Sequence, residues 1–383
     1  MASVKQNFQD NNLGQSDSNH RQNMDNEIII IGAGSTGLST AIFLNDKGYN
    51  VRIFDKRERT KITKAVGINP VTLQLFEKTG ITQRFINNGW KLETSNFWYK
   101  DSLVYKNPFS TIKHPYPFMI IQPQFETENI LEEYLNEKGI FVERNYDLNS
   151  LKTESQLTTL DFVNLENQQH LDIQTKNIVV GADGNKSKVR EEAGIKLKGW
   201  EHDDVYTLYD VELDTPLSSK EIHYIFHKEG TILMLHIKDG IWRVGGNLPN
   251  VLDNLPTGTK TGKITWETNF TIREMVSEKL NQNNVFVLGD AAHIHSPLGG
   301  KGMNMCIEDS HIFADYLSQN RQNEYSDFRL KKLRKTVGIL GQLTEVVGGK
   351  HFIGNTIRSQ MKNFSFAFPI FMPYMRKFLL GLK

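Results

Sequence analysis

A glycine-rich turn near the start of the chain constrains its fold more than any other feature. Residues 28–31 form a short, apolar, β-branched run, the pattern of a parallel strand buried on both faces. The sequence Gly-Ala-Gly-Ser-Thr-Gly follows at residues 32–37, and residues 35–47 carry apolar side chains at helical spacing. A second strand at residues 50–54 completes the pattern. This order predicts a βαβ unit that binds a dinucleotide.

Each glycine of the turn has its own role in such a unit. Gly32 permits the tight turn, Gly34 lets the backbone approach a pyrophosphate, and Gly37 lets the helix pack closely on the strand. The start of the helix offers free N–H groups and the positive end of its dipole to the phosphates. Asp55, at the end of the second strand, can accept from ribose hydroxyls, and Lys56 beside it is a further cofactor-binding candidate. The pattern does not distinguish FAD from NAD(P).

Two further motifs also follow apolar strands. Gly-Ala-Asp-Gly occupies residues 181–184, and Gly-Asp-Ala-Ala-His occupies residues 289–293. Asp290 can bind the hydroxyls of a ribityl chain, and residues 297–304 form a glycine-rich stretch that leads into a helix. The N–H groups at that helix start can face the electron-rich edge of a reduced flavin. For residues 181–184, the alternative is an ordinary Asp-Gly turn at the end of a strand. For the glycines of residues 297–304, the alternative is a flexible loop.

The composition argues against strongly charged partners. The 383 residues include 45 basic and 44 acidic side chains, and a net charge of +1 gives no electrostatic reason to expect nucleic acid or an anionic membrane. Cys306 is the single cysteine, so no intramolecular disulfide can form, and we interpret it as a small buried side chain. We expect a cytoplasmic location, no membrane-spanning segment and no metal site.

The rest of the chain predicts interleaved domains. Residues 1–24 are rich in Asn, Gln and Ser and are expected to be a disordered tail. Alternation of period two indicates an antiparallel sheet at residues 205–246 and one strand at residues 97–105. The aromatic, basic C-terminal residues predict helices that pack on the body, with a membrane-surface role as the alternative. The predicted organisation is a nucleotide-binding domain (25–96, 120–195 and 270–335), a sheet domain (97–119 and 196–269) and a helical region (336–383).

In this order, the three motifs resemble those of the class A flavoprotein monooxygenases, the para-hydroxybenzoate hydroxylase-like group. The resemblance runs from about Glu27 to the C-terminus and includes residues 64–80, 120–131 and 266–276. It implies an α/β fold: a Rossmann-like FAD-binding domain with a parallel sheet, an inserted, mainly antiparallel substrate domain, and C-terminal helices. It also implies an enzyme that uses NADPH or NADH and O2 to hydroxylate an aromatic or polycyclic small molecule through a flavin C4a-hydroperoxide. Many members add a C-terminal thioredoxin-like domain, for which this chain is too short, so we expect a short form of the family. We also expect a monomer or a homodimer.

The resemblance also implies roles for single residues. The ADP half of FAD would be bound by Gly32, Gly34, Gly37 and Asp55. Gln122 would contact the ribityl or ring side of the cofactor.

The later motifs supply the remaining candidates. Asp183 and Gly184 belong to a motif associated with both FAD and NAD(P)H, and Arg190 would support that turn. Gly289 and Asp290 would hold the ribityl and pyrophosphate region. The isoalloxazine ring would be lined by Pro297, Gly299, Gly300, Gly302, Met303 and Asn304.

One position departs from the family pattern. Lys64 stands where many members carry arginine, and lysine keeps the charge but loses the planar fork. A role of Lys64 in moving the flavin or docking the nicotinamide would therefore differ in detail.

Other reactions on the same cofactor remain open. A tetracycline-inactivating or other antibiotic-modifying monooxygenase would use the same fold with a wider pocket. A flavin oxidoreductase without hydroxylation and a non-catalytic FAD-binding module are further alternatives. A flavin-dependent halogenase is disfavoured, because the Trp-x-Trp-x-Ile-Pro signature of that family is absent from the sequence.

The sequence assigns no catalytic residue. His223, His227 and His236 lie in the predicted sheet, where an exposed or hydrogen-bonded histidine is the ordinary interpretation. His293 and His295 follow the third motif, and we interpret both as structural residues around the flavin.

Overall fold

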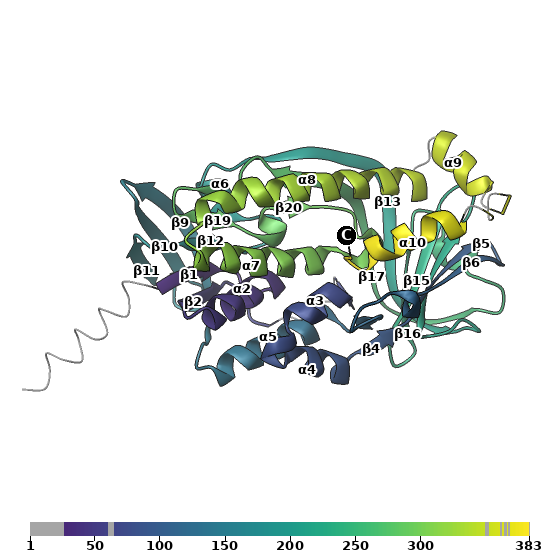
Figure 1. Cartoon of the computed structure of the whole chain (residues 1–383), viewed down its shortest axis with the longest axis horizontal. Coiled ribbons are helices and arrows are strands. Elements are labelled where there is room, and N and C mark those ends of the chain that lie inside the picture. The colour runs from purple at the N-terminus through teal and green to yellow at the C-terminus, as the bar shows by residue number, and fades with distance from the viewer. Residues whose placement is uncertain are drawn as a thin grey trace, which may run out of the picture.

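A mainly parallel sheet and a larger, mainly antiparallel sheet, in which β14 and β5 pair in parallel, lie next to each other along the long axis of the molecule (Figure 1). The computed structural model describes residues 27–59, 65–348, 352–360, 362–363, 366 and 368–382. The predictions for the tail at residues 1–24 and for Lys64 fall outside these residues.

The parallel sheet contains the βαβ unit predicted from the first glycine-rich turn. Its strands are parallel except for the β18–β19 pair at one edge. In spatial order they are β18 (Asn281–Gln282), β19 (Val285–Val287), β12 (Val179–Gly181), β1 (Glu27–Ile31), β2 (Asn50–Asp55) and β8 (Val142–Arg144). The central strand β1 is almost wholly apolar and buried, as a strand covered on both faces must be.

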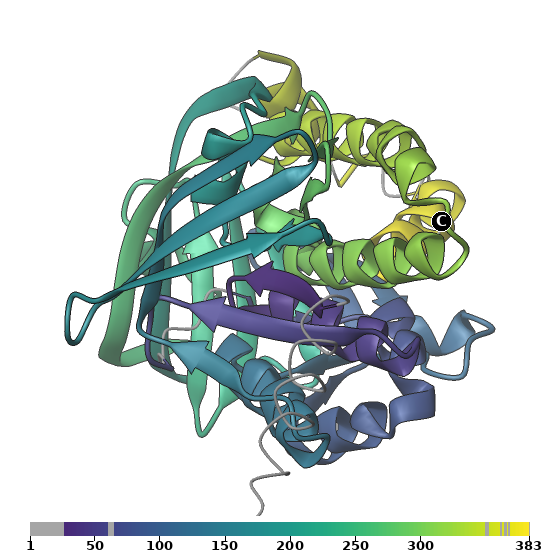
Figure 2. The ribbon, with the colours of Figure 1, turned by 90° about the vertical axis from the view of Figure 1, so that its left-hand side faces the viewer.

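Helices cover one face of this sheet, and a small antiparallel sheet covers the other (Figure 2). The helices are α2 (Ser35–Asp46), α5 (Gln124–Glu137) and α7 (Gly302–Ser318). The small sheet contains β9 (Tyr146–Glu154), β10 (Leu157–Asn164) and β11 (His170–Thr175). Phe54 of β2 stacks on Phe162 of β10 with ring centroids 4.5 Å apart, so this layer is part of the same apolar core.

Short elements connect the two large sheets. They are β3 (Gly67–Ile68), α3 (Pro70–Leu75), α4 (Ile81–Asn88), β4 (Trp90–Leu92), β7 (Met119–Ile121) and α6 (Lys188–Glu192). β3, β7 and β4 pair as a three-stranded sheet.

The large sheet confirms the antiparallel insertion and corrects one strand. Its spatial order is β20 (His293–Ile294), β17 (Lys260–Ser277), β13 (Leu197–Asp214), β16 (Ile241–Gly246), β15 (Thr231–Lys238), β14 (Glu221–Phe226), β5 (Thr94–Tyr99) and β6 (Ser102–Pro108). The prediction of one strand over residues 97–105 is wrong. The chain reverses at Lys100, whose φ is +52°, so that β5 and β6 form an antiparallel hairpin.

Three further helices follow α7. They are α8 (Gln322–Val347), α9 (Phe352–Ser359) and α10 (Phe368–Leu379). α10 packs on β6 and the neighbouring strands, which confirms helices that pack on the body. The domain boundaries stay a prediction, and β17 runs without a break across the one at 269–270. Among the described residues, no helix is long and apolar enough to cross a bilayer.

Candidate functional site

The three sequence motifs meet at one edge of the parallel sheet. They follow β1, β12 and β19, which are neighbours in the sheet and run in the same direction. A Cβ added at Gly32 would lie 2.4 Å from the carbonyl oxygen of Ala182, and one at Gly289 would lie 2.4 Å from Oγ1 of Thr36. The first turn therefore touches both of the others, and glycine is required where they touch. Ligands of open α/β sheets bind at this edge, outside the carboxyl ends of the strands.

The first turn has the geometry that pyrophosphate binding requires. Gly32 has φ +105°, and a Cβ at Gly37 would lie 1.8 Å from the carbonyl oxygen of Gly32, so neither position accepts a side chain. A Cβ at Gly34 would meet only Oε1 of Glu128, at 3.6 Å. Gly34 is also the N-cap of α2, and no side chain caps the helix there. The backbone at Gly34 is thus open to a ligand.

The two residues after β2 lie differently. Asp55 is buried, and its carboxylate accepts from the backbone N–H of Ala33 at 2.7 Å and of Arg57 at 2.8 Å. Each carboxylate oxygen can accept more than one bond, so the group that shapes the turn can still accept from a ribose. Lys56 is exposed and forms an ion pair with Asp147 at 3.3 Å.

Helix α5 brings two polar groups to the first turn that the sequence analysis missed. Glu128 accepts from the N–H of Ser35 at 3.0 Å and from the amide of Gln124 at 2.8 Å, and burial raises its pKa. Gln124 in turn accepts from the N–H of Ala65 at 3.0 Å. The predicted residue Gln122 is wholly buried and donates to Thr127 at 2.8 Å. The Oε1 of Gln122 is buried and has no partner among the described residues, so its contact with the cofactor stays a prediction. Gln124 is a further candidate, and its position four residues before Glu128 on one helix could have suggested it.

The second motif is held by local hydrogen bonds. Asp183 accepts from the hydroxyl of Ser187 at 2.5 Å and from the N–H of Val189 at 3.1 Å, and burial raises its pKa. The guanidinium of Arg190 donates to the carbonyls of Asn185 at 3.1 Å and Ala291 at 2.9 Å. Arg190 thus ties the second motif to the third, which agrees with the supporting role predicted for it.

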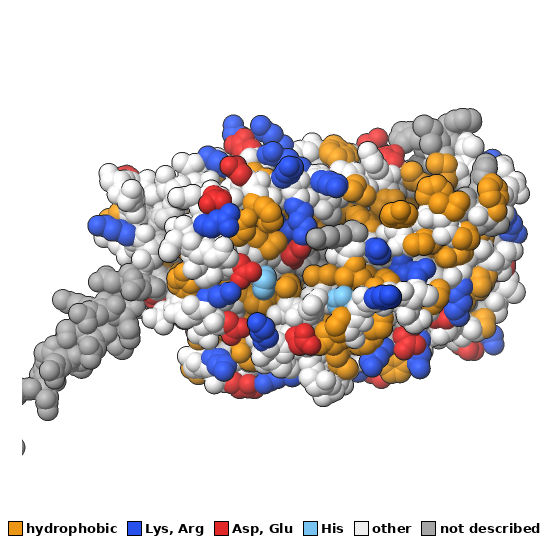
Figure 3. Space-filling model, viewed as in Figure 1, with side chains coloured by type: hydrophobic (Ala, Val, Ile, Leu, Met, Phe, Trp, Pro, Cys, Tyr) orange, Lys and Arg blue, Asp and Glu red, His pale blue; other side chains and the backbone are white. Residues whose placement is uncertain are grey.

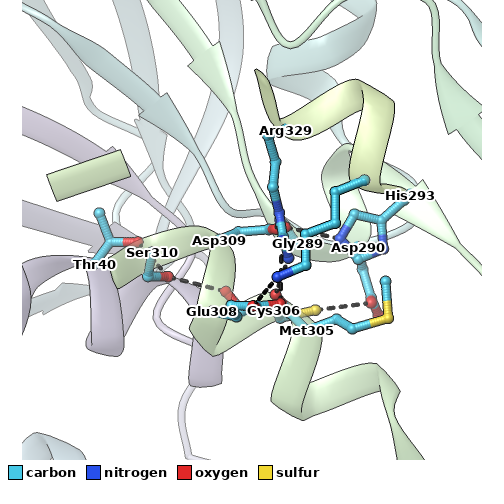
Figure 4. A network of polar contacts seen from close by, with 11 residues as sticks. Thr40, Gly289, Asp290, His293, Met305, Cys306, Glu308, Asp309, Ser310 and Arg329 are labelled. Carbon is cyan, nitrogen blue, oxygen red and sulfur yellow. Dashed lines mark hydrogen bonds and ion pairs between the residues drawn. The ribbon is translucent and has the colours of Figure 1, made fainter. Parts of the chain in front are cut away.

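A buried charge network anchors the third motif (Figure 4). Asp309 of α7 accepts from the N–H of Gly289 at 3.0 Å and pairs with Nε2 of His293 at 2.7 Å. Its other oxygen accepts from Nε of Arg329 on α8 at 2.5 Å. Burial alone would raise the pKa of Asp309, but Arg329 and His293 lower it to about 2. The network holds the turn against two helices, which supports a structural role for His293.

Asp290 points away from this network. It is exposed, and its nearest described polar partner is Sγ of Cys306 at 3.4 Å. Its carboxylate is therefore available to a ligand at the edge of the sheet. Cys306 itself is buried, and burial raises the pKa of its thiol well above the usual value, so the structure agrees with an inert side chain.

The glycine-rich stretch after the third motif forms a loop that leads into α7. Gly299 and Gly300 have φ of +78° and +60°, and no side chain caps α7 at Lys301. Asn304 donates to the carbonyls of Gly67 and Gly300, both at 2.8 Å, and so fixes the loop to β3. We call residues 297–302 the flavin loop.

The first residue of the flavin loop and the residue that follows the loop have different surroundings. Pro297 is exposed, whereas Met303 is buried in the core behind the loop. Gly302 has room around it, since an added Cβ would meet only a ring atom of His295 at 3.9 Å. The lining of the ring by these residues stays a prediction, and Met303 could contribute to it only through its backbone, because its side chain is in the core.

The end of α10 covers the flavin loop. A Cβ at Gly299 would lie 2.8 Å from Cδ2 of Leu379, and the ammonium of Lys301 lies 3.9 Å from the ring centroid of Phe378. Burial lowers the pKa of Lys301 to about 8. Lys301 was not predicted from the sequence, where it is one lysine among many. Its fold position places a cation at the start of α7, beside the predicted site of the flavin ring.

The sheet register decides which side chains face α10 and the flavin loop. Tyr224 and Phe226 pack with Met372 of α10, whereas Ile225 and Met234 belong to a separate apolar cluster around Trp242. Of the sheet histidines, His223 accepts from the indole of Trp98 at 3.2 Å, and His236 packs against Trp242. These two histidines therefore lie on the side of Trp242, away from α10. His227 follows β14, and burial lowers its pKa.

A buried carboxyl next to the flavin loop also escaped the sequence analysis. Glu274 of β17 is wholly buried, accepts from the N–H of Ser296 at 3.2 Å, and lies 3.9 Å from Nε2 of His202. Burial raises its pKa to about 7, and its Oε2 has no partner among the described residues. Burial also lowers the pKa of His295 to about 4, so that histidine is neutral. The sequence of β17 does not predict that Glu274 is buried, because the alternation of a strand does not show which elements pack on each of its faces.

The residues at the edge of the sheet fit FAD. Two helix starts without side-chain caps, at Gly34 and at Lys301, face the places where a pyrophosphate and a flavin edge would lie. Among the described residues, no group of three or more His, Cys, Asp and Glu could hold a metal ion. Two surface hollows of about 380 and 390 Å³ lie elsewhere, beside Gly240 and beside Gly194, and none of the three motifs lines them.

This fold and site define a flavoprotein of the dinucleotide-binding α/β class. A family model described as FAD binding domain matches residues 25–242 and 250–332. The chain therefore belongs to the FAD binding domain family, and FAD is its cofactor.

Named relatives and a solved structure agree with this membership. The chain is 27% identical over 310 residues to 6-methylpretetramide 4-monooxygenase of Streptomyces rimosus, covering 75% of this chain and 55% of that protein. It is 28% identical over 319 residues to pentachlorophenol 4-monooxygenase of Sphingobium chlorophenolicum, covering 76% and 57%. The chain thus spans little more than half the length of these relatives. The fold is similar to that of p-nitrophenol 4-monooxygenase PnpA from Pseudomonas putida DLL-E4, with a TM-score of 0.81, 18% identity, and 92% and 96% coverage. These findings confirm the resemblance to class A flavoprotein monooxygenases.

Proposed function

We propose that this chain is an FAD-dependent monooxygenase that uses NADPH or NADH and O2 to hydroxylate an aromatic or polycyclic small molecule. The observation that carries the proposal is the meeting of three strand-terminal motifs at one edge of the parallel sheet. The first two turns suit a dinucleotide, and the aromatic face of the large sheet under α10, which holds Tyr224 and Phe226, would suit a flat apolar substrate. Relatives named for 6-methylpretetramide and pentachlorophenol support an aromatic substrate.

The cofactor would supply electron transfer and oxygen activation, and the protein would supply binding, orientation and shielding. Gly32, Gly34 and the start of α2 would hold the pyrophosphate, with Asp55 at the ribose. Asp290 would bind the ribityl hydroxyls.

The flavin loop would hold the ring edge through the backbone N–H groups at the start of α7. The ammonium of Lys301 would stabilise negative charge there. Phe378 and Leu379 would exclude water from one side of the loop.

The purified, FAD-loaded protein would test the reaction. NADPH and NADH consumption would be followed against a panel of phenols and polycyclic aromatics that includes a tetracycline, with product mass and H2O2 measured in the same samples. We expect substrate-stimulated consumption and a product heavier by one oxygen atom. Consumption that yields only H2O2 would favour an oxidoreductase without hydroxylation. Yellow protein without stimulated consumption would favour a binding module.

The matched variants are Gly34→Ala, which would block the phosphate position, and Gly338→Ala, at a glycine within α8 where an added Cβ would meet nothing within 4 Å. Only the first should lose FAD and activity together. A cytoplasmic location and a monomeric or homodimeric state remain predictions, which cell fractionation and light scattering would test.

A further inference from the structure

Helix α10 has two faces, and only one of them is used within the described structure. Its inner face holds Met372 against the aromatic cluster of the large sheet, and Nε of Arg376 donates to Asn107 at 2.6 Å. Phe368 stacks on Tyr105 with ring centroids 5.6 Å apart. These contacts fix the orientation of the helix, so the side chains on its other face are held outward.

That outer face exposes large apolar side chains. Ile370, Phe371 and Tyr374 are 66%, 65% and 77% exposed, and they are among the most exposed large hydrophobic side chains that the structure describes. Their spacing of one and three residues places them on one side of the helix, and exposed Lys377 continues the row. Apolar side chains gather over this part of the molecule with basic groups among them (Figure 3). A contiguous exposed apolar surface of this kind marks an interaction site.

The charge of the surrounding segment identifies the partner. Residues 346–383 contain no Asp or Glu, and their basic residues are Lys350, Arg358, Lys362, Arg376, Lys377 and Lys383. The net charge of +1 for the whole chain therefore hides a strongly basic C-terminal segment. Arg358 and Arg376 are used internally, but Lys362 and Lys377 are exposed. Lys362 precedes α10, and its ammonium lies 5.8 Å from the ring centroid of Tyr99, whereas Lys377 is on the helix itself. Exposed aromatic side chains beside a lysine on a short helix, in a segment without acidic residues, are typical of an interface with anionic lipid.

We propose that the outer face of α10 docks on the surface of an anionic lipid bilayer. Ile370, Phe371 and Tyr374 enter the boundary between headgroups and acyl chains, and Lys362 and Lys377 face the lipid phosphates. The helix lies in the plane of the interface. This inference concerns a surface outside the candidate site and holds whichever reaction the flavin performs.

The test is flotation of the FAD-loaded chain with two kinds of vesicle. One kind contains phosphatidylcholine alone, and the other contains phosphatidylcholine mixed with phosphatidylglycerol. We expect binding to the mixed vesicles that weakens in high salt. Replacing both Lys362 and Lys377 by Gln should weaken it roughly tenfold or more, since each lysine near an anionic surface contributes roughly fivefold.

Serine variants separate the apolar contribution from the charge. The triple variant Ile370→Ser, Phe371→Ser and Tyr374→Ser should lose at least roughly tenfold in vesicle affinity. Phe141→Ser is the matched control, because Phe141 is 66% exposed outside this surface. All these side chains are exposed, so far-UV circular dichroism and retained FAD should be unchanged.

A tryptophan reporter tests the depth of the contact. Phe371→Trp should give a blue-shifted emission with mixed vesicles, whereas Phe141→Trp should not. The proposal would be overturned if the protein did not bind mixed vesicles, or if the α10 variants bound them as well as the wild type. It would also be overturned if the wild type were a dimer, the serine variant were a monomer, and neither bound to vesicles. The last result would assign the surface to a second copy of this chain.

Discussion

Replacing Glu274 by glutamine should stabilise the protein at alkaline pH and leave it nearly unchanged in acid. Burial raises the pKa of Glu274 from 4.5 to about 7, so the folded state holds a proton that the unfolded chain has released. The folded state therefore loses stability as pH rises from 4.5, and the loss is complete above about pH 7. The difference in pKa corresponds to roughly 3 kcal/mol, because one pH unit is about 1.4 kcal/mol.

Glutamine keeps the size of the side chain and the oxygen that accepts from Ser296, but it cannot ionise. Thermal unfolding of the FAD-loaded protein should show a Tm several degrees higher for Glu274→Gln at about pH 8, and a change below about 1 kcal/mol at about pH 5. Glu154→Gln, at an exposed position on β9, is the matched control and should change neither. A lower Tm at about pH 8 would refute the reasoning, since it would mean that the charged carboxylate stabilises the fold.

Further variants test other parts of the site. Gly34→Ala should fold normally and lose FAD affinity by roughly tenfold or more, which FAD fluorescence measures. Gly37→Ala should fail to fold stably, because its Cβ would lie 1.8 Å from a carbonyl oxygen, and its Tm should show this. Arg329→Met should cost roughly 3–5 kcal/mol in urea unfolding, because it leaves the buried carboxylate of Asp309 without its cation. In the wild type, the pKa of Asp309 is lowered to about 2, so its contribution should be lost only as pH falls below 3.8 towards 2. Lys301→Met should raise the Tm at about pH 7, and this advantage should shrink as pH rises from about 8 to 10.5, because the unfolded chain keeps its charged ammonium until then.

The net charge illustrates how a whole-chain property can mislead. A value of +1 gave no reason to expect an anionic membrane, yet all acidic residues precede residue 346. The fold then fixes the inner face of α10 and turns Ile370, Phe371 and Tyr374 outward. The separation of acidic residues from the C-terminal segment is visible in the sequence, but the direction in which each face of α10 points is not.

The sequence by itself determined the dinucleotide-binding unit and the meeting of its motifs. At Gly32 and Gly37 the backbone approaches another backbone segment so closely that only glycine fits. This requirement is why the glycine motif can be recognised in the sequence. The three motifs each follow an apolar strand, and the ends of parallel strands share one edge of a sheet. That rule made their convergence predictable across more than half of the chain.

Only the tertiary structure decided the surroundings of the first turn and of the flavin loop. Glu274 comes from β17, Glu128 from α5 and Phe378 from α10, and each reaches its place through packing between elements distant in sequence. The β-hairpin at Lys100 and the register of β14 were equally undetermined, because a shift by one residue exchanges the two faces of a strand. Local patterns specify backbone conformation, whereas the pKa and exposure of a side chain depend on what the rest of the chain packs around it.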